Sequence, residues 1–204
     1  MLESIVSGTI AGLLAGIIST FFGIRYATHL SEKQNKIKED KLLENYHAEI
    51  DLIIYKHGQW LKQLIVELKS PMADKFGKPV EIDFNIVNFY HRNLIGVLSS
   101  EHRKLISWLE LMSNVLKNNS NTRFDGKVES SLLYLPTHHT SILIVDVCKV
   151  IYFLSKSMVN QKTFIFDNSF SNLEICRLAC EFTNTEFEDS WFSSVVNEYQ
   201  ENHF

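Results

Sequence analysis

Two adjacent histidines, His138 and His139, precede an apolar segment that contains Asp146 and Cys148. Histidine, cysteine and aspartate are common transition-metal ligands, so a metal site is the first chemistry that this segment suggests. Adjacent side chains on a helix point in different directions, however, and the HxxxH and HExxH spacings that place two histidines on one face are absent. The pattern therefore does not predict a metal site.

The three cysteines are Cys148, Cys176 and Cys180. Cys176 and Cys180 share a helix face, but neither a CxxC nor a paired-histidine motif accompanies them, so we expect buried apolar cysteines. Arg177 follows Cys176, and a neighbouring cation lowers a thiol pKa, yet no base completes a nucleophilic pair. An odd, small number of cysteines indicates no disulfide framework and a reducing compartment.

The other familiar catalytic motifs are missing from the sequence. It has no phosphate-binding glycine loop, no GxSxG motif and no kinase signature. We therefore expect a protein that is not an enzyme and that has no metal or cofactor.

A modest basic cluster lies in two segments that are expected to be helical. It is either a solvated face or a site for an anionic ligand or lipid headgroups. The net charge of the whole chain is −4, so the sequence predicts no direct binding of nucleic acid. The candidate contacts, with two cations near the N-terminal apolar run, are Arg25, Lys33, His91, Arg92, Arg103 and Lys104.

Residues 5–24 read IVSGTIAGLLAGIISTFFGI and carry no charge. About twenty helical residues span roughly 30 Å, the thickness of a bilayer core. A signal peptide is disfavoured because no Lys or Arg precedes the run and no small-x-small cleavage site follows it. A buried core helix is disfavoured by the length and the lack of charge. The sequence therefore predicts a transmembrane anchor over residues 1–28.

The charges that flank this run predict its orientation. No basic residue precedes it, whereas Arg25, Lys33, Lys36, Lys38 and Lys41 follow closely. The positive-inside rule then places the C-terminal side in the cytoplasm. We expect a single-pass protein, in the bacterial inner membrane, with its N-terminus outside and its main domain inside.

Small residues follow two neighbouring ridges of the predicted anchor. In lipid, such residues let helix backbones approach closely, which favours association. We expect association with copies of the chain, although another protein's helix and a merely compositional origin remain alternatives. The predicted packing residues are Ser4, Gly8, Ala11, Gly12, Ala15, Gly16, Ser19, Thr20 and Gly23.

The sequence that follows the predicted anchor indicates an all-α fold. In this fold the single transmembrane helix is followed by a polar stalk (29–41) and a cytoplasmic helical bundle (42–204). Apolar residues at three- and four-residue steps predict one long helix over 31–69, continuous with the anchor and ended by Ser70-Pro71. Further helices are expected at 85–98, 101–117, 137–158, 172–183 and 188–202. We expect a surface loop at 118–126, a short extended piece at 80–83, and either a short strand or a buried extended loop at 162–166.

We expect the core of the bundle to include Trp60, Leu64, Trp108, Ile144 and Ile151. The segment around Ile144 is apolar enough to suggest a second span, but Asp146 and Lys149 interrupt it, so a central buried helix is the better interpretation.

Two functions fit this architecture. The first is a membrane-anchored effector or assembly protein whose glycine-rich helices self-associate and perturb the bilayer under control of the cytoplasmic domain. Small bacterial defence and toxin-like effectors share this general design, as an analogy only. The alternative is a passive membrane scaffold that recruits a cytoplasmic protein partner. An effector needs Gly8, Gly12 and Gly16, whereas a passive anchor tolerates leucine there.

Overall fold

The computed structural model describes residues 2–73, 76–123, 128–129, 132–134, 137–159, 163–167 and 169–202. Within these ranges, the side chains of residues 2–15, 17–18, 72–73, 128–129 and 132–134 are not described. Contacts divide the chain into two compact units, Met1–Glu44 and Asn45–Phe204.

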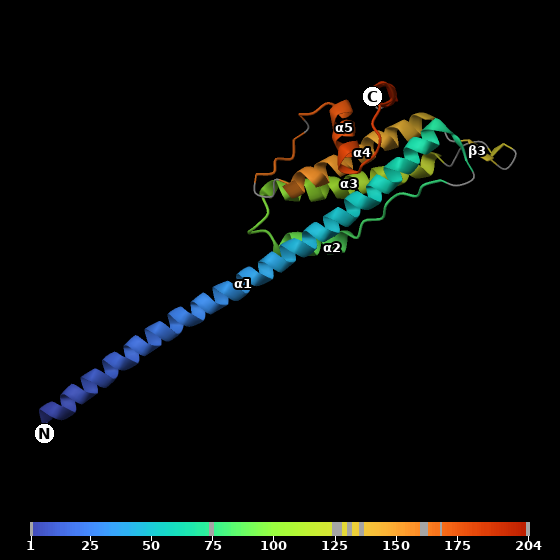
Figure 1. Ribbon diagram of the computed structural model, residues 1–204. Helices are drawn as coiled ribbons and strands as arrows, with labels where there is room; N and C mark the ends of the chain where they lie inside the picture. The colour runs from blue at the N-terminus through green and yellow to red at the C-terminus, as the bar shows by residue number, and fades with distance from the viewer. Residues whose placement is uncertain are drawn as a thin grey trace. The chain divides into compact units, whose positions relative to one another are not determined.

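The described residues form six helices, which confirms a helical fold (Figure 1). The helices are α1 (Leu2–Lys69), α2 (Phe84–Asn93), α3 (Ser100–Arg123), α4 (Thr137–Val159), α5 (Asn172–Phe182) and α6 (Asp189–Asn202). Three strands that the sequence did not predict, β1 (Met72–Ala73), β2 (Val128–Glu129) and β3 (Leu132–Tyr134), form a small antiparallel sheet in the order β1-β3-β2. Met72 pairs with Tyr134 and Val128 with Leu133.

Helix α1 is continuous from Leu2 to Lys69, as predicted, and ends before Ser70-Pro71, because proline disfavours helical backbone at the preceding residue. Among the side chains that the structure describes, no helix offers an apolar stretch long enough to cross a membrane. Residues 5–15, 17 and 18, most of the predicted span, lie outside those described side chains. The transmembrane anchor therefore stays a prediction.

Helix α4 is the centre of the second unit and packs against α3, α5 and α6 (Figure 1). Its side chains from Thr140 to Cys148 are all buried, so it has no solvent face over that stretch. A helix that is apolar on all sides is stable only when it is surrounded. The prediction of a central buried helix is confirmed.

Four of the five predicted core residues, Trp60, Leu64, Ile144 and Ile151, are buried. Trp108 is only half-buried, because it borders a cavity. Its ring still packs against Phe153, with 5.1 Å between the ring centroids.

The predicted loop at 118–126 is wrong in its first part, because α3 continues to Arg123. Leu116, Ser120 and Arg123 are buried on one helix face, and this packing overrides the loop-like composition of the sequence. Residues 124–126 lie outside the described part of the chain. Helix α2 also ends earlier than expected, at Asn93.

The two predicted extended pieces have no regular secondary structure where they are described. Asp83 ends the first piece and caps α2, since its Oδ1 accepts a hydrogen bond from the Asn85 backbone N–H at 2.9 Å. In the second piece, Phe164 is buried but Thr163 and Ile165 are exposed, so the described part of this segment is a loop with one buried side chain rather than a strand.

Candidate functional site

The predicted packing face of the anchor is described only at Gly16, Ser19, Thr20 and Gly23. A Cβ atom added at Gly16 or Gly23 would meet nothing within 4 Å. The hydroxyls of Ser19 and Thr20 donate to the Gly16 carbonyl at 3.0 and 2.8 Å, so each is satisfied within the helix. The other predicted packing residues, Ser4, Gly8, Ala11, Gly12 and Ala15, lie outside the described side chains.

Large apolar side chains are exposed where the predicted span ends. Phe21, Phe22, Ile24 and Tyr26 are each between 60 and 71% exposed. Exposed apolar area of this kind makes the segment a candidate for contact with a membrane or another protein.

The predicted basic cluster contains two kinds of side chain. His91 and the neighbouring His102 are buried, and burial lowers the pKa of each, with Arg103 lowering that of His91 further. Lys104 is exposed but forms an ion pair with Glu101 at 2.8 Å. Arg92 and Arg103 are exposed, so an anion site on α2 and α3 would depend chiefly on these two guanidinium groups. Arg25 and Lys33 belong to the other unit.

The cysteines are all buried, as predicted. Burial raises the pKa of Cys148 well above its ordinary value, and the neighbouring thiols of Cys176 and Cys180 raise it further. The three thiols of α4 and α5 therefore meet in the core. This environment disfavours the reactive thiolate.

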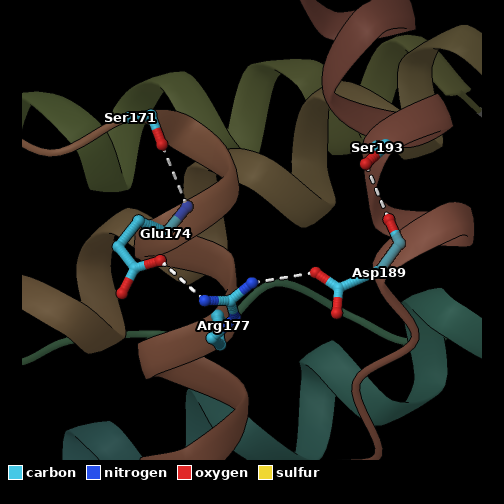
Figure 2. Close-up of polar contacts among 5 residues, drawn as sticks. All are labelled: Ser171, Glu174, Arg177, Asp189 and Ser193. Carbon is cyan, nitrogen blue, oxygen red and sulfur yellow. Dashed lines mark hydrogen bonds and ion pairs between the residues drawn. The ribbon is translucent and has the colours of Figure 1, made fainter.

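Arg177 does not act on Cys176, because it lies at the surface (Figure 2). Its guanidinium donates to Glu174 Oε2 at 3.1 Å and to Asp189 Oδ1 at 2.9 Å, and so links α5 to the first turn of α6. The Ser171 hydroxyl caps α5 by accepting from the Glu174 N–H, and Ser193 donates to the Asp189 carbonyl (Figure 2). Solvent screens an exposed network of this kind, so its role is local.

The rings of His138 and His139 are 4.0 Å apart between centroids. Burial lowers the pKa of His139, and His138 and Arg123 lower it further. Across the residues that the structure describes, no group of three or more His, Cys, Asp and Glu side chains is arranged to hold a metal ion.

A buried ion pair connects the C-terminal ends of α1 and α3. Arg123, which is 0% exposed, donates to Glu67 Oε2 at 2.7 Å. Glu67 Oε1 accepts the Gly77 N–H at 2.6 Å, and Arg123 Nη2 donates to the Gly77 carbonyl at 3.4 Å. The pair thus fixes the chain that follows α1, and this role is structural.

A second polar cluster, which sequence reasoning missed, lies between α4 and α6. Lys149 Nζ donates to the Tyr199 hydroxyl at 2.6 Å, and that hydroxyl donates to Asp146 Oδ1 at 3.3 Å. Lys149 Nζ also lies 3.5 Å from Asp146 Oδ1. Burial and the Asp146 carboxylate raise the pKa of Tyr199, so its hydroxyl stays protonated. The available signal was the pair Asp146 and Lys149 within an otherwise apolar helix.

A groove of about 1170 Å³ lies between α1, residues 76–84 and α3. Three lysines, Lys56, Lys78 and Lys117, line it with a single acidic residue, Glu81. Its apolar lining includes Phe76 and Phe84.

Comparison with protein-family models, with curated proteins and with solved structures gives no match.

Proposed function

We propose that this chain is a membrane-anchored, non-enzymatic effector or assembly protein whose glycine-rich helices self-associate and perturb the membrane under control of the helical domain. One observation carries the proposal. The uncharged run of residues 5–24 belongs to the same continuous helix, α1, that contributes Trp60 and Leu64 to the core of the second unit.

The exposed side chains at the end of that run support a lipid environment. Phe21, Phe22 and Ile24 are each between 60 and 64% exposed, and water is an unfavourable surrounding for such apolar area. The hydroxyls of Ser19 and Thr20 are bonded to the helix backbone, so they do not oppose burial in lipid.

The open glycine positions support association through the anchor. Added atoms at Gly16 and Gly23 would meet nothing, so this part of α1 has room for a second helix. Because α1 continues into the folded unit without a break, association of the anchors would bring helical domains together, and a change in the domains would act on the anchors.

The lysine-lined groove favours the alternative, a passive membrane scaffold. Lys56, Lys78 and Lys117 against Glu81 give the groove a net positive lining in a chain whose net charge is −4. With Phe76 and Phe84 beside them, these charges suit an acidic protein segment that also carries apolar side chains.

The substitution Gly12→Leu separates the two functions. It places a bulky side chain where two backbones should nearly touch, while it raises the hydrophobicity of the span, so membrane insertion should persist. We expect crosslinking in membranes and depolarisation of the cell, measured with a potential-sensitive dye, to fall together.

The control is Leu13→Ala, at a neighbouring position outside the glycine ridge. It removes more apolar area but should affect crosslinking less. If Gly12→Leu crosslinks and depolarises as the parent does, the small residues have no packing role and the scaffold is the better function.

A further inference from the structure

A cavity of about 400 Å³ lies between α3, α4, α5 and α6, beside the cluster of Asp146, Lys149 and Tyr199. Every residue that lines it belongs to the unit Asn45–Phe204. Its volume lies within the range of small-molecule sites, about 300–1,000 Å³.

Aromatic rings supply much of the cavity wall. Trp108 comes from α3, Phe153 from α4 and Phe170 from the segment before α5. Trp108 and Phe153 pack edge to face, with ring planes at 72°. Trp108 is half-buried and Phe170 is exposed, so both have ring surface that the protein core does not cover. Such walls favour a planar aromatic guest over a flexible chain.

The polar end of the cavity contains a hydrogen-bond donor with one proton that no described residue accepts. Lys149 Nζ carries three protons, and its partners among the described residues are Tyr199 and Asp146. The third proton is therefore available to an acceptor on a ligand. The side chain of Lys149 is 20% exposed, so a ligand can reach this nitrogen.

The charges at this end favour a neutral guest. Asp146 balances Lys149, and Tyr199 stays protonated, so the lining has no net charge. An anion that approached Lys149 would also approach the carboxylate of Asp146, and a cation would meet the ammonium group.

We propose that this cavity binds a neutral, planar aromatic molecule that carries a carbonyl or ring-nitrogen acceptor. The uncovered ring surfaces of Trp108 and Phe170 contact its faces and edges, with Phe153 packed behind Trp108, and the Lys149 ammonium donates to its acceptor. A fused aromatic lactam is the simplest compound of this class. The site does not depend on the membrane anchor, because the anchor contributes no residue to it.

Three probes of similar size test the proposal against the full chain in lipid nanodiscs. They are 2-quinolone, which has a ring carbonyl, naphthalene, which has no acceptor, and 2-naphthoate, which is an anion. Isothermal titration calorimetry, with protein-free nanodiscs subtracted, should show 2-quinolone binding about ten-fold tighter than either of the others, because a hydrogen bond to a charged donor contributes about that much. Equal or tighter binding of naphthalene or 2-naphthoate, or no binding of 2-quinolone, overturns the proposal.

Two variants of adjacent residues locate the binding. Met112 lines the cavity, and Met112→Trp fills it, so binding of 2-quinolone should be lost. Leu111 is 62% exposed and does not line the cavity, so Leu111→Trp should bind as the parent does. Equal affinity in the two variants shows that the probe binds elsewhere and overturns the proposal.

The substitution Lys149→Met removes the donor and keeps the stem of the side chain. It should reduce the affinity for 2-quinolone about ten-fold, to that for naphthalene, and leave the affinity for naphthalene unchanged. An unchanged preference for 2-quinolone contradicts the assigned role of Lys149. Because Lys149→Met leaves Asp146 without its ammonium partner, circular dichroism must first show that the variant is folded. If it is not folded, the comparison of Met112→Trp with Leu111→Trp decides whether the cavity is the binding site.

Discussion

His57 is a titratable side chain inside the core of the second unit. It is fully buried on α1, its Nδ1 lies 2.8 Å from the Ile53 carbonyl, and its ring lies 6.4 Å from that of Trp60. Burial lowers the pKa of His57 to about 4, against 6.5 in the unfolded chain. The folded protein therefore holds this ring neutral at pH values where the unfolded chain would protonate it.

This difference in pKa predicts an acid-dependent loss of stability. Between about pH 6.5 and 4 the unfolded chain binds a proton at His57 and the folded chain does not, so acid favours the unfolded state. The folded state therefore keeps its full stability above about pH 6.5 and loses on the order of 3 kcal/mol in the free energy of unfolding as the pH falls toward 4. The variant His57→Phe, which cannot titrate, should lose correspondingly less stability over the same interval. Urea unfolding at several pH values, followed by tryptophan fluorescence, measures both curves. The difference between parent and variant should be constant above pH 7, and parallel curves between pH 6.5 and 4 would show that His57 is not held neutral.

Single residues of the candidate cavity were only partly predictable. Asp146 and Lys149 stand out in the sequence because they interrupt an apolar segment, and their i,i+3 spacing places them near each other. Tyr199 lies 50 residues beyond Lys149, and nothing in its sequence neighbourhood distinguishes it from other tyrosines. Only the packing of α6 on α4 brings its hydroxyl to the ammonium group.

At the scale of elements, the long periodic helices were predictable because a repeated apolar face identifies them independently of their surroundings. The end of α3 was not, because Asn and Ser favour loops in isolation, while the burial of Ser120 and the Arg123–Glu67 pair are tertiary contacts. The small sheet escaped prediction for the same reason: strands of two or three residues are too short for an alternating pattern.

Gly58 shows why α1 contains a residue of low helix propensity. A Cβ atom at this position would lie 2.8 Å from Cγ2 and 3.0 Å from Cβ of Thr183, the residue that follows α5. Helix α1 and the end of α5 thus approach too closely for any side chain larger than hydrogen.

The substitution Gly58→Ala should therefore destabilise the protein. Alanine improves helix propensity by about 1 kcal/mol, but overpacking costs about 1–3 kcal/mol, so we expect a net loss of about 1 kcal/mol. Adding Thr183→Ser removes Cγ2 and keeps the hydroxyl that donates to the Ala179 carbonyl, so it should restore part of the loss. Chemical denaturation of the parent, the two single variants and the double variant measures the free energies of unfolding. The control is Gln59→Ala, at an exposed position of the same helix, whose free energy of unfolding should stay within about 0.5 kcal/mol of the parent's. A Gly58→Ala variant more stable than the parent would mean that the helices can move apart without cost.

At the scale of the whole molecule, α1 changes character along its length. Its described side chains from Ser19 to Lys41 are exposed on every face, whereas Tyr46, Ile50 and Ile53 are buried. Residues 29–41 are mostly polar and include four lysines and two glutamates, so this part of the helix needs no apolar partner and is consistent with a solvated helix.

The arrangement of charge around the apolar run predicts how the chain enters a membrane. Basic residues resist translocation, and Arg25, Lys33, Lys36, Lys38 and Lys41 all follow the run. A C-terminal fusion to alkaline phosphatase, which is active only outside the cytoplasm, should be inactive in bacterial cells, and a C-terminal green fluorescent protein should fluoresce.

Moving the charges provides the control. Four lysines inserted after Met1, together with glutamine at the five basic positions, should reverse both readouts, because the excess of basic residues then precedes the run. Deletion of residues 1–30 should release the protein from the membrane fraction in salt. An active phosphatase fusion of the parent chain would place the helical domain on the opposite side of the membrane, and a deleted chain that stays bound would mean that residues beyond the run also hold it there.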